Sequence, residues 1–127
     1  MVGKNLNSVS KVKALNEIDN DDLILDIGPK TIDTIKKAIE KSETVLWNGP
    51  AGYFENPNFA SGSYEIAEAI INKNENRSIY SVVGGGDTIA LINKINAIKK
   101  FNFVSTAGGA FLEYLEGKDL PGIKALS

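Results

Sequence analysis

The 127-residue chain contains neither cysteine nor histidine. Without cysteine there is no disulfide framework and no thiol chemistry. Without histidine, imidazole acid–base catalysis, serine–histidine triads and histidine-rich metal sites are excluded. An enzyme built from this chain therefore needs chemistry that works without imidazole. Phosphoryl transfer meets that condition, because positioning and charge stabilisation carry most of its catalysis.

Strong net charge and long apolar runs are also lacking. The formal net charge is -2, which gives no reason to expect broad attraction to nucleic acid or to anionic membranes. No run approaches the ~18 apolar residues of a membrane-spanning helix. The first seven residues lack the apolar core of a signal peptide. A chain of this length with 43% hydrophobic residues is expected to form one domain with a buried core.

Short apolar runs alternate with amphipathic segments along the chain. The runs predict four strands, at residues 23–27, 44–48, 78–83 and 101–105. Helices are predicted from Thr31, from Ser61 or Ser63, after the glycines at 84–86, and after those at 108–109. This alternation predicts an α/β fold, a three-layer αβα arrangement in which helices cover both faces of a parallel, Rossmann-like sheet.

The apolar period within each predicted helix indicates which side chains face the core. These side chains are Ile32, Ile35 and Ile39 in the first helix, Ile66, Ala69 and Ile70 in the second, Leu91, Ile92 and Ile95 in the third, and Phe111, Tyr114 and Leu115 in the last. Gly117 is expected to end the last helix, and residues 120–122 to form a final turn.

Polar or glycine-rich segments follow the second, third and fourth predicted strands. They span residues 48–55, 84–88 and 105–109. In open parallel sheets, ligands bind in the crevice outside the carboxyl ends of the strands. The three segments should therefore meet at one edge of the sheet and form the functional site.

The segment Gly84-Gly-Gly-Asp-Thr88 is the strongest single candidate for that site. Glycines let a ligand approach the backbone, and the helix that follows directs free N–H groups and partial positive charge at the same place. Phosphates bind at such turns, and Asp87 could offer an oxygen to the accompanying cation. The alternative is that Asp87 caps its helix and the glycines only make the turn. Neither the dinucleotide fingerprint nor the P-loop pattern is present.

Other residues near the strand ends have a structural and a functional interpretation. Glu55 could accept hydrogen bonds from ribose hydroxyls, or could be a solvated surface carboxylate. Trp47 is expected in the core, and Asp26 in a turn or cap. Ser105 and Thr106 could donate to phosphate or cap the last helix.

Five motifs together resemble phosphoglycerate kinase. They are Leu25-Asp-Ile-Gly-Pro29, Trp47-Asn-Gly-Pro-Ala-Gly52 with Phe54-Glu55, Gly84-Gly-Gly-Asp-Thr88, Ser105-Thr-Ala-Gly-Gly-Ala110 and Leu115-Glu-Gly-Lys-Asp-Leu-Pro-Gly122. They occur in the order, and near the spacing, of the C-terminal nucleotide-binding domain of that family. The resemblance covers nearly the whole chain.

The resemblance implies a cytoplasmic, monomeric two-domain kinase of glycolysis. Such an enzyme moves a phosphoryl group between 1,3-bisphosphoglycerate and ADP, giving 3-phosphoglycerate and ATP, with Mg²⁺. The resemblance also implies that Glu55 holds the ribose, that Gly85, Gly86 and Thr88 bind phosphate, and that Asp87 is the magnesium ligand. It implies that Gly108 and Gly109 face the transferring phosphoryl group.

The sequence departs from the family in three respects. Tyr53 replaces a smaller aliphatic residue near the base, and Ala107 replaces the first glycine of the second turn, where a methyl would strain a positive φ. The family's N-terminal substrate domain is not encoded here, so residues 1–127 are expected to be part of the C-terminal domain. Alone, the chain is expected to be inactive and to self-associate. The competing hypotheses are a stand-alone nucleotide-binding module and a non-catalytic interaction domain.

Overall fold

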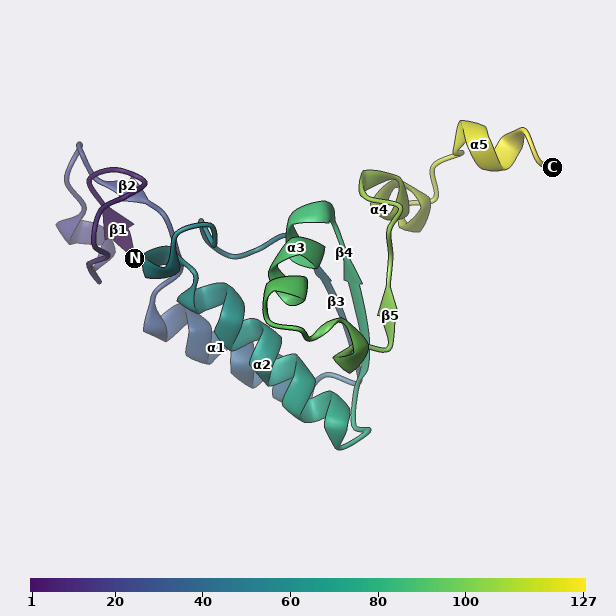
Figure 1. The fold of residues 1–127 in the computed structure, drawn as a ribbon, viewed down its shortest axis with the longest axis horizontal. Helices are drawn as coiled ribbons and strands as arrows, with labels where there is room; N and C mark the ends of the chain where they lie inside the picture. The colour runs from purple at the N-terminus through teal and green to yellow at the C-terminus, as the bar shows by residue number, and fades with distance from the viewer.

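The computed structural model describes residues Met1–Ser127 and contains two separate sheets. The larger is a parallel sheet with the order β3-β4-β5, formed by Thr44–Asn48, Tyr80–Gly84 and Phe103–Val104. The smaller pairs β1 (Val2–Gly3) with β2 (Leu23–Ile24) in antiparallel register. Figure 1 shows the smaller sheet at one end of the molecule and the parallel sheet near its middle.

Three long helices accompany the parallel sheet. They are α1 (Pro29–Lys41), α2 (Ser61–Glu75) and α3 (Gly86–Lys94). Because the strands follow the chain in one direction across the sheet, right-handed crossovers place α2 and α3 on the same face. The helix α1 packs on α2, and Lys73 of α2 donates a 3.0 Å hydrogen bond to the Ile39 carbonyl near the end of α1. The predicted α/β fold with a parallel sheet flanked by helices is confirmed.

The core lies between these helices and one face of the sheet. Its buried members include Ile39 of α1, Ile66 and Ile70 of α2, and Leu91 and Ile92 of α3. The sheet contributes Trp47 and Val83, and the ring of Phe101 lies 6.4 Å from that of Trp47. The prediction that Trp47 belongs to the core is confirmed. Ile95, predicted to face inward, is instead exposed, because α3 ends one residue before it.

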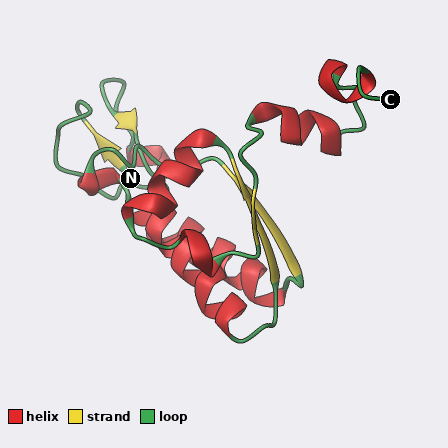
Figure 2. Ribbon diagram, turned by 45° about the vertical axis from the view of Figure 1, so that its right-hand side comes forward, coloured by secondary structure: helices red, strands yellow, loops and turns green.

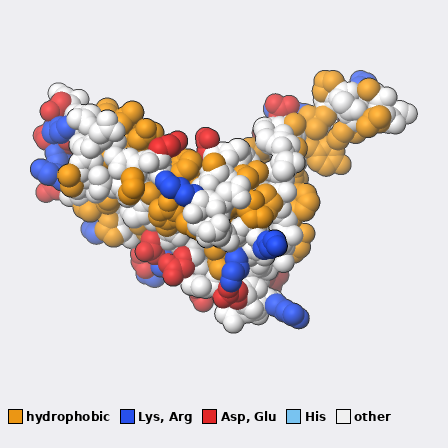
Figure 3. All heavy atoms as spheres, in the orientation of Figure 1, with side chains coloured by type: hydrophobic (Ala, Val, Ile, Leu, Met, Phe, Trp, Pro, Cys, Tyr) orange, Lys and Arg blue, Asp and Glu red, His pale blue; other side chains and the backbone are white.

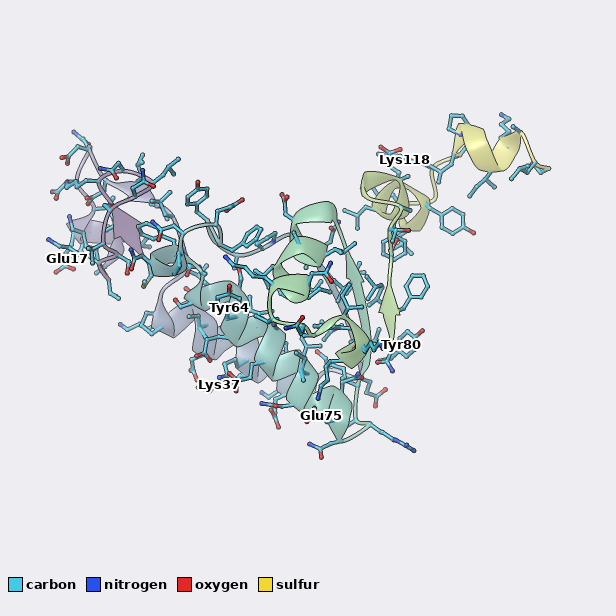
Figure 4. The ribbon with its side chains drawn as sticks, in the orientation of Figure 1. Glu17, Lys37, Tyr64, Glu75, Tyr80 and Lys118 are labelled. Carbon is cyan, nitrogen blue, oxygen red and sulfur yellow. The ribbon has the colours of Figure 1, made fainter.

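The opposite face of the sheet is mostly uncovered; its helical contact comes from Phe111 of α4 (Gly109–Leu115), whose ring lies 6.5 Å from that of Phe103. Leu46, Val82 and Phe103 are register partners in one row across the three strands, and Leu46 and Phe103 are 44% and 49% exposed. Tyr80 is also exposed, and its side chain lies on the side of the sheet away from α1 and α2 (Figure 4). Figure 2 shows the main group of helices, α1 to α3, on one side of the strands. We call the surface formed by Leu46, Tyr80, Val82 and Phe103 the bare face; the predicted second helix layer is not part of this chain's fold.

The first predicted strand, residues 23–27, is wrong as a buried member of the parallel sheet. Only Leu23–Ile24 is extended and paired, and both side chains are exposed. Its partner is the amino-terminal strand β1, while the Leu25 amide donates to the Met1 carbonyl at 3.0 Å. An apolar run shows that a segment favours strand geometry, but the available neighbour decides which sheet it joins.

The C-terminal residues form an arm that extends away from the sheet. It contains α4 (Gly109–Leu115) and α5 (Pro121–Lys124), and Figures 1 and 2 show both helices apart from the other three. Gly117 follows α4 with φ +79°, as predicted for the residue that ends a helix. The predicted packing of Tyr114 and Leu115 is wrong, since both are more than half exposed, and apolar atoms cover much of the arm in Figure 3.

Candidate functional site

The three predicted loops meet at the carboxyl edge of the parallel sheet, which we call the rim. Asn48, the last residue of β3, is the register partner of Gly84, the last residue of β4. On the other side of β4, Val83 pairs with Val104, and the Ser105 amide donates to the Val83 carbonyl at 2.7 Å. The segments 48–55, 84–88 and 105–109 therefore leave the sheet side by side.

The turn between β4 and α3 has the geometry of an anion-binding site. Gly85 precedes α3 with φ +86°, a conformation that favours glycine, and a β-carbon there would overlap the Asn48 amide oxygen. The first helical hydrogen bond runs from the Ile89 amide to the Gly85 carbonyl at 3.0 Å. The amides of Gly86, Asp87 and Thr88 consequently have no partner within the helix, and the first two belong to exposed residues that a ligand can reach.

Asp87 lies in the first turn of α3 and is exposed. The residue preceding the helix is Gly85, and no side chain caps this end, so the alternative that Asp87 is the helix cap is wrong. Its carboxylate has no hydrogen-bond partner in the protein and is free to bind a cation at the rim. A β-carbon on the neighbouring Gly86 would meet nothing within 4 Å, so the space beside this carboxylate is open.

Thr88 has a role that its place in the motif does not reveal. It is completely buried, and its Oγ1 accepts a 2.7 Å hydrogen bond from the Gly49 amide, 39 residues away in the chain. The Gly49 carbonyl in turn accepts a 2.9 Å hydrogen bond from Nε1 of Trp47. The Thr88 hydroxyl therefore binds the 48–55 loop.

Glu55 is exposed and lies at the end of the loop that Gly49 begins. The loop is anchored on the way, because the Ala51 amide donates to Ser63 Oγ at 2.9 Å and the Tyr53 amide donates to the Leu25 carbonyl at 2.8 Å. Phe54, immediately before Glu55, is buried in the core. The Glu55 carboxylate makes no hydrogen bond within the protein, so it remains available to a ligand.

Asp26 is buried and caps the start of α2. Its carboxylate accepts hydrogen bonds from the Gly62 amide at 2.9 Å and from Ser61 Oγ at 3.2 Å. Gly52 and Gly62 allow this close approach, because a β-carbon on either would overlap the carboxylate. The predicted turn or cap role of Asp26 is confirmed. Its carboxylate also lies against Gly52 of the 48–55 loop.

The second glycine turn lies beside the first. Gly108 has φ +59° and precedes α4, while Ala107 has no positive φ, so its methyl group imposes no backbone strain. Ser105 is buried, and its Oγ accepts a 3.4 Å hydrogen bond from the Ala107 amide. Phe111 of α4 packs over the Gly84 backbone, where its ring would lie 3.3 Å from an added β-carbon. Gly108 and Gly109 therefore border the rim.

Asn48 is a rim residue that sequence reasoning did not single out. Its amide oxygen lies against Gly85, at the junction of two of the three loops. A polar residue at the end of an apolar strand was the available signal, but the same pattern also ends strands that have no site.

The larger surface hollows do not coincide with the rim. One of about 550 Å³ lies between the amino-terminal segment and the start of α1, with Val12, Ile18, Ile24, Ile27 and Pro29 in its lining. The rim is instead an open edge formed by backbone turns, and its interpretation depends on the chemistry of those turns and not on a cavity.

A second group of carboxylates lies in the amino-terminal segment. Oxygens of Asp19, Asp21 and Asp22 are within 4.8 Å of one another. The Lys13 ammonium lies 2.6 Å from both Asp19 and Asp22, and Lys4 lies 2.7 Å from Asp21. Hydrogen bonds from Lys13, the Asp19 amide and Lys4 hold the pKa of Asp22 far below its ordinary value. Two lysines thus pair with the three carboxylates and offset two of their three charges, in the segment that connects β1 to β2.

Comparisons with known proteins identify relatives of this chain. The family model described as phosphoglycerate kinase matches residues 1–118. The phosphoglycerate kinase of Dictyoglomus turgidum is 49% identical over 117 residues, which cover 92% of this chain and 29% of the relative. That of Buchnera aphidicola subsp. Schizaphis graminum is 46% identical, covering 98% of this chain and 32% of the relative. The chain thus spans about a third of the length of these relatives.

Solved structures give the same result. Phosphoglycerate kinase from Coxiella burnetii superposes with a TM-score of 0.87 at 41% identity, over 97% of this chain and 31% of that one. The enzyme from Pyrococcus horikoshii OT3 superposes with a TM-score of 0.70 at 38% identity, over 83% of this chain and 25% of that one. No helix in this structure has the length and apolarity needed to span a membrane.

Proposed function

The chain belongs to the phosphoglycerate kinase family, and we propose that residues 1–127 form part of the nucleotide-binding domain of such an enzyme. The reaction is phosphoryl transfer between 1,3-bisphosphoglycerate and ADP, giving 3-phosphoglycerate and ATP. The observation that carries this proposal is the turn from Gly84 to Thr88, where free amides at the start of α3 meet an unpartnered carboxylate.

In this proposal the nucleotide phosphates lie against the start of α3. The amides of Gly86 and Asp87 donate to phosphate oxygens, and the positive end of the helix dipole favours their negative charge. Gly85, with its positive φ, forms the turn, and Gly86 permits close approach, because no side chain lies there between the ligand and the backbone. This binding requires no histidine, in agreement with the composition.

The residues at the rim also fit a magnesium ion bound with the nucleotide. Asp87 supplies a carboxylate oxygen, the ligand type that Mg²⁺ prefers, beside open space at Gly86. When bound, the metal would supply positive charge that offsets the charge developing during transfer. The chain's own contribution is to keep Asp87 free of protein partners and close to the phosphate-binding amides.

Glu55 and the second glycine turn complete the proposed site. Glu55 accepts hydrogen bonds from ribose hydroxyls, and Gly108 and Gly109 face the phosphoryl group in transfer. The other substrate needs a basic pocket on a second wall, which these residues do not supply. Arg77, the only arginine, lies before β4, at the opposite end of the sheet from the rim.

Titration of the chain with ADP, with and without Mg²⁺, tests the proposal. ADP should bind more tightly with Mg²⁺, and Asp87→Asn should reduce this gain by about tenfold, which corresponds to ~1.4 kcal/mol. Asp119→Asn removes an exposed carboxylate from the arm and serves as the matched control. If Asp87→Asn keeps the full magnesium effect, the ligand role of Asp87 is wrong. If the unsubstituted chain does not bind ADP at any magnesium concentration, nucleotide binding by these residues is wrong.

A further inference from the structure

The backbone of Gly49 is bound by two buried side chains, one from a strand and one from a helix. Its N–H donates to Thr88 Oγ1 at 2.7 Å, and its carbonyl accepts from Trp47 Nε1 at 2.9 Å. Thr88 is completely buried and Trp47 is 7% exposed. Gly49 has φ +103°, a conformation that glycine adopts without steric cost. Glycine adopts negative φ values about as readily. A free glycine peptide at this point would sample several orientations.

Each of the two side chains is itself fixed. Thr88 belongs to the first turn of α3, so its hydroxyl has a constant position relative to the free amides of Gly86 and Asp87. Trp47 is in β3, and its ring packs in the core beside Phe101. The 48–55 loop is otherwise anchored to α2 through Ser63 and to residue 25 through Tyr53. Among the hydrogen bonds of the loop, only the one to Thr88 connects it to the helix that begins at the phosphate turn.

We propose that Thr88 and Trp47 are positioning residues that hold Gly49 as a latch between the 48–55 loop and the turn at 84–88. The latch sets the distance between the carboxylate of Glu55, at one end of the loop, and the free amides of α3. A nucleotide bridges these two places with its ribose and its phosphates, so the latch adapts the rim to both parts of one ligand. This inference rests on the proposed nucleotide site and gives the Thr88 hydroxyl a role of its own, which is to hold the 48–55 loop.

The latch predicts that its loss is felt at the ribose and not at the phosphates. Thr88→Val keeps the shape of the side chain but removes the acceptor, and leaves the Gly49 amide without its partner in the protein. It should weaken ADP binding about tenfold, equivalent to ~1.4 kcal/mol, and inorganic tripolyphosphate binding less than about twofold. Thr88→Ser retains the hydroxyl and should restore most of the ADP affinity.

A double-mutant cycle with Glu55→Gln shows whether Thr88 acts through the loop. If it does, Thr88→Val should have little further effect on ADP once Glu55 is replaced. Equal weakening of ADP binding and tripolyphosphate binding would indicate a general loss of folding. Additive effects of the two substitutions would show that Thr88 acts independently of Glu55. Either result would overturn the inference.

Hydrogen exchange at the Gly49 amide gives a second measurement that needs no nucleotide. This amide should be protected in the unsubstituted chain and in Thr88→Ser, and should exchange at least about tenfold faster in Thr88→Val. An unprotected Gly49 amide in the unsubstituted chain would show that the latch does not exist. If neither ADP nor tripolyphosphate binds, the proposed function and the nucleotide-positioning role both fail, while the exchange data still decide whether the loop is held.

Discussion

At the scale of single residues, Gly85 and Gly86 are adjacent but have different reasons to be glycine. Gly85 has a positive φ and touches the Asn48 side chain, so both its backbone and its surroundings exclude a β-carbon. Gly86 is in the first turn of α3, without a positive φ, and a β-carbon there would meet no protein atom. The first glycine builds the turn, and the second keeps the ligand's space empty.

We expect alanine at these two positions to separate stability from binding. Gly85→Ala should lower the free energy of unfolding by about 1–3 kcal/mol, because a non-glycine residue is forced into a strained conformation. Gly86→Ala should leave stability unchanged or raise it by up to ~1 kcal/mol, since alanine favours the helix, yet it should weaken ADP binding. Urea unfolding and ADP titration of both variants measure this. Tight ADP binding by Gly86→Ala would contradict the proposed phosphate position.

Glu55 should affect only ligands that contain ribose. Glu55→Gln should weaken ADP binding by about five- to tenfold, or ~1–1.4 kcal/mol, because a hydrogen bond to a charged acceptor is replaced by a neutral one. Binding of inorganic tripolyphosphate should stay nearly the same. Calorimetric titration of each ligand decides the matter. Glu116→Gln, in the arm beyond α4, is the control, and a similar loss for both ligands would indicate disturbed folding instead.

At the scale of secondary-structure elements, the amino-terminal sheet depends on charge. β1 and β2 are two residues each, and such a short antiparallel pair is marginal on its own. Lys13 pairs with Asp22, whose side chain is 2% exposed. Hydrogen bonds to Asp19 and Asp22 raise the pKa of Lys13, and the bond from Lys13 is the largest cause that lowers the pKa of Asp22. The ion pairs therefore add a pH-dependent contribution to the interactions that hold residues 1–24 together.

This sheet should loosen in acid. A carboxyl group whose pKa is lowered by folding stabilises the fold above its unfolded pKa, about 3.9, and loses that contribution as pH falls through the lower folded pKa. The Val2 and Lys11 amides, which donate to each other's carbonyl oxygens at 2.8 Å, should stay protected at pH 5 and lose protection progressively below pH about 4. Amide exchange followed against pH measures this.

Asp22→Asn should already show weak protection at pH 5 and little further change in acid. Asp21→Asn is the matched control, because Asp21 is an exposed neighbour and its ion pair with Lys4 is open to solvent. The same acid response in Asp22→Asn and in the unsubstituted chain would show that Asp22 is not the group responsible.

The sequence predicted those elements whose signals are local. Glycine turns after apolar strands located the rim, and the apolar period placed Ile66 and Ile70 of α2 in the core. What depends on partners far along the chain could not be predicted in this way. The neighbour of Leu23–Ile24 and the bond from Gly49 to Thr88 are both of this kind. A threonine in a phosphate turn gives no sign that its hydroxyl already has a partner.

At the scale of the whole molecule, the sheet has one protected face and one unprotected face. Its edges are β3 and β5, and exposed strand edges can pair with other chains. The bare face adds an apolar row that includes Leu46 and Phe103. The chain alone thus has an α/β core, a ligand rim and surfaces that promote association.

We expect the purified chain to show no measurable kinase activity. Holding two substrates together contributes about 7–11 kcal/mol of barrier reduction, and only one substrate has a proposed site here. A coupled assay for ATP formation from 1,3-bisphosphoglycerate and ADP measures this against a control without protein. Activity clearly above that control, in a preparation that mass spectrometry shows to be free of longer enzyme, would contradict the expectation.

Light scattering on the same sample should detect association that Phe103→Lys reduces, while Lys99→Met, a substitution outside the bare face, leaves it unchanged.

Trp47 is the chain's single tryptophan, and it is one of the two residues of the latch. All intrinsic indole fluorescence therefore originates at the point where β3 passes into the loop. A loop that separates from Thr88 would move the Gly49 carbonyl away from the indole N–H and admit water, shifting the emission to longer wavelength. The protein contains its own optical reporter for the state of this loop, without any attached dye.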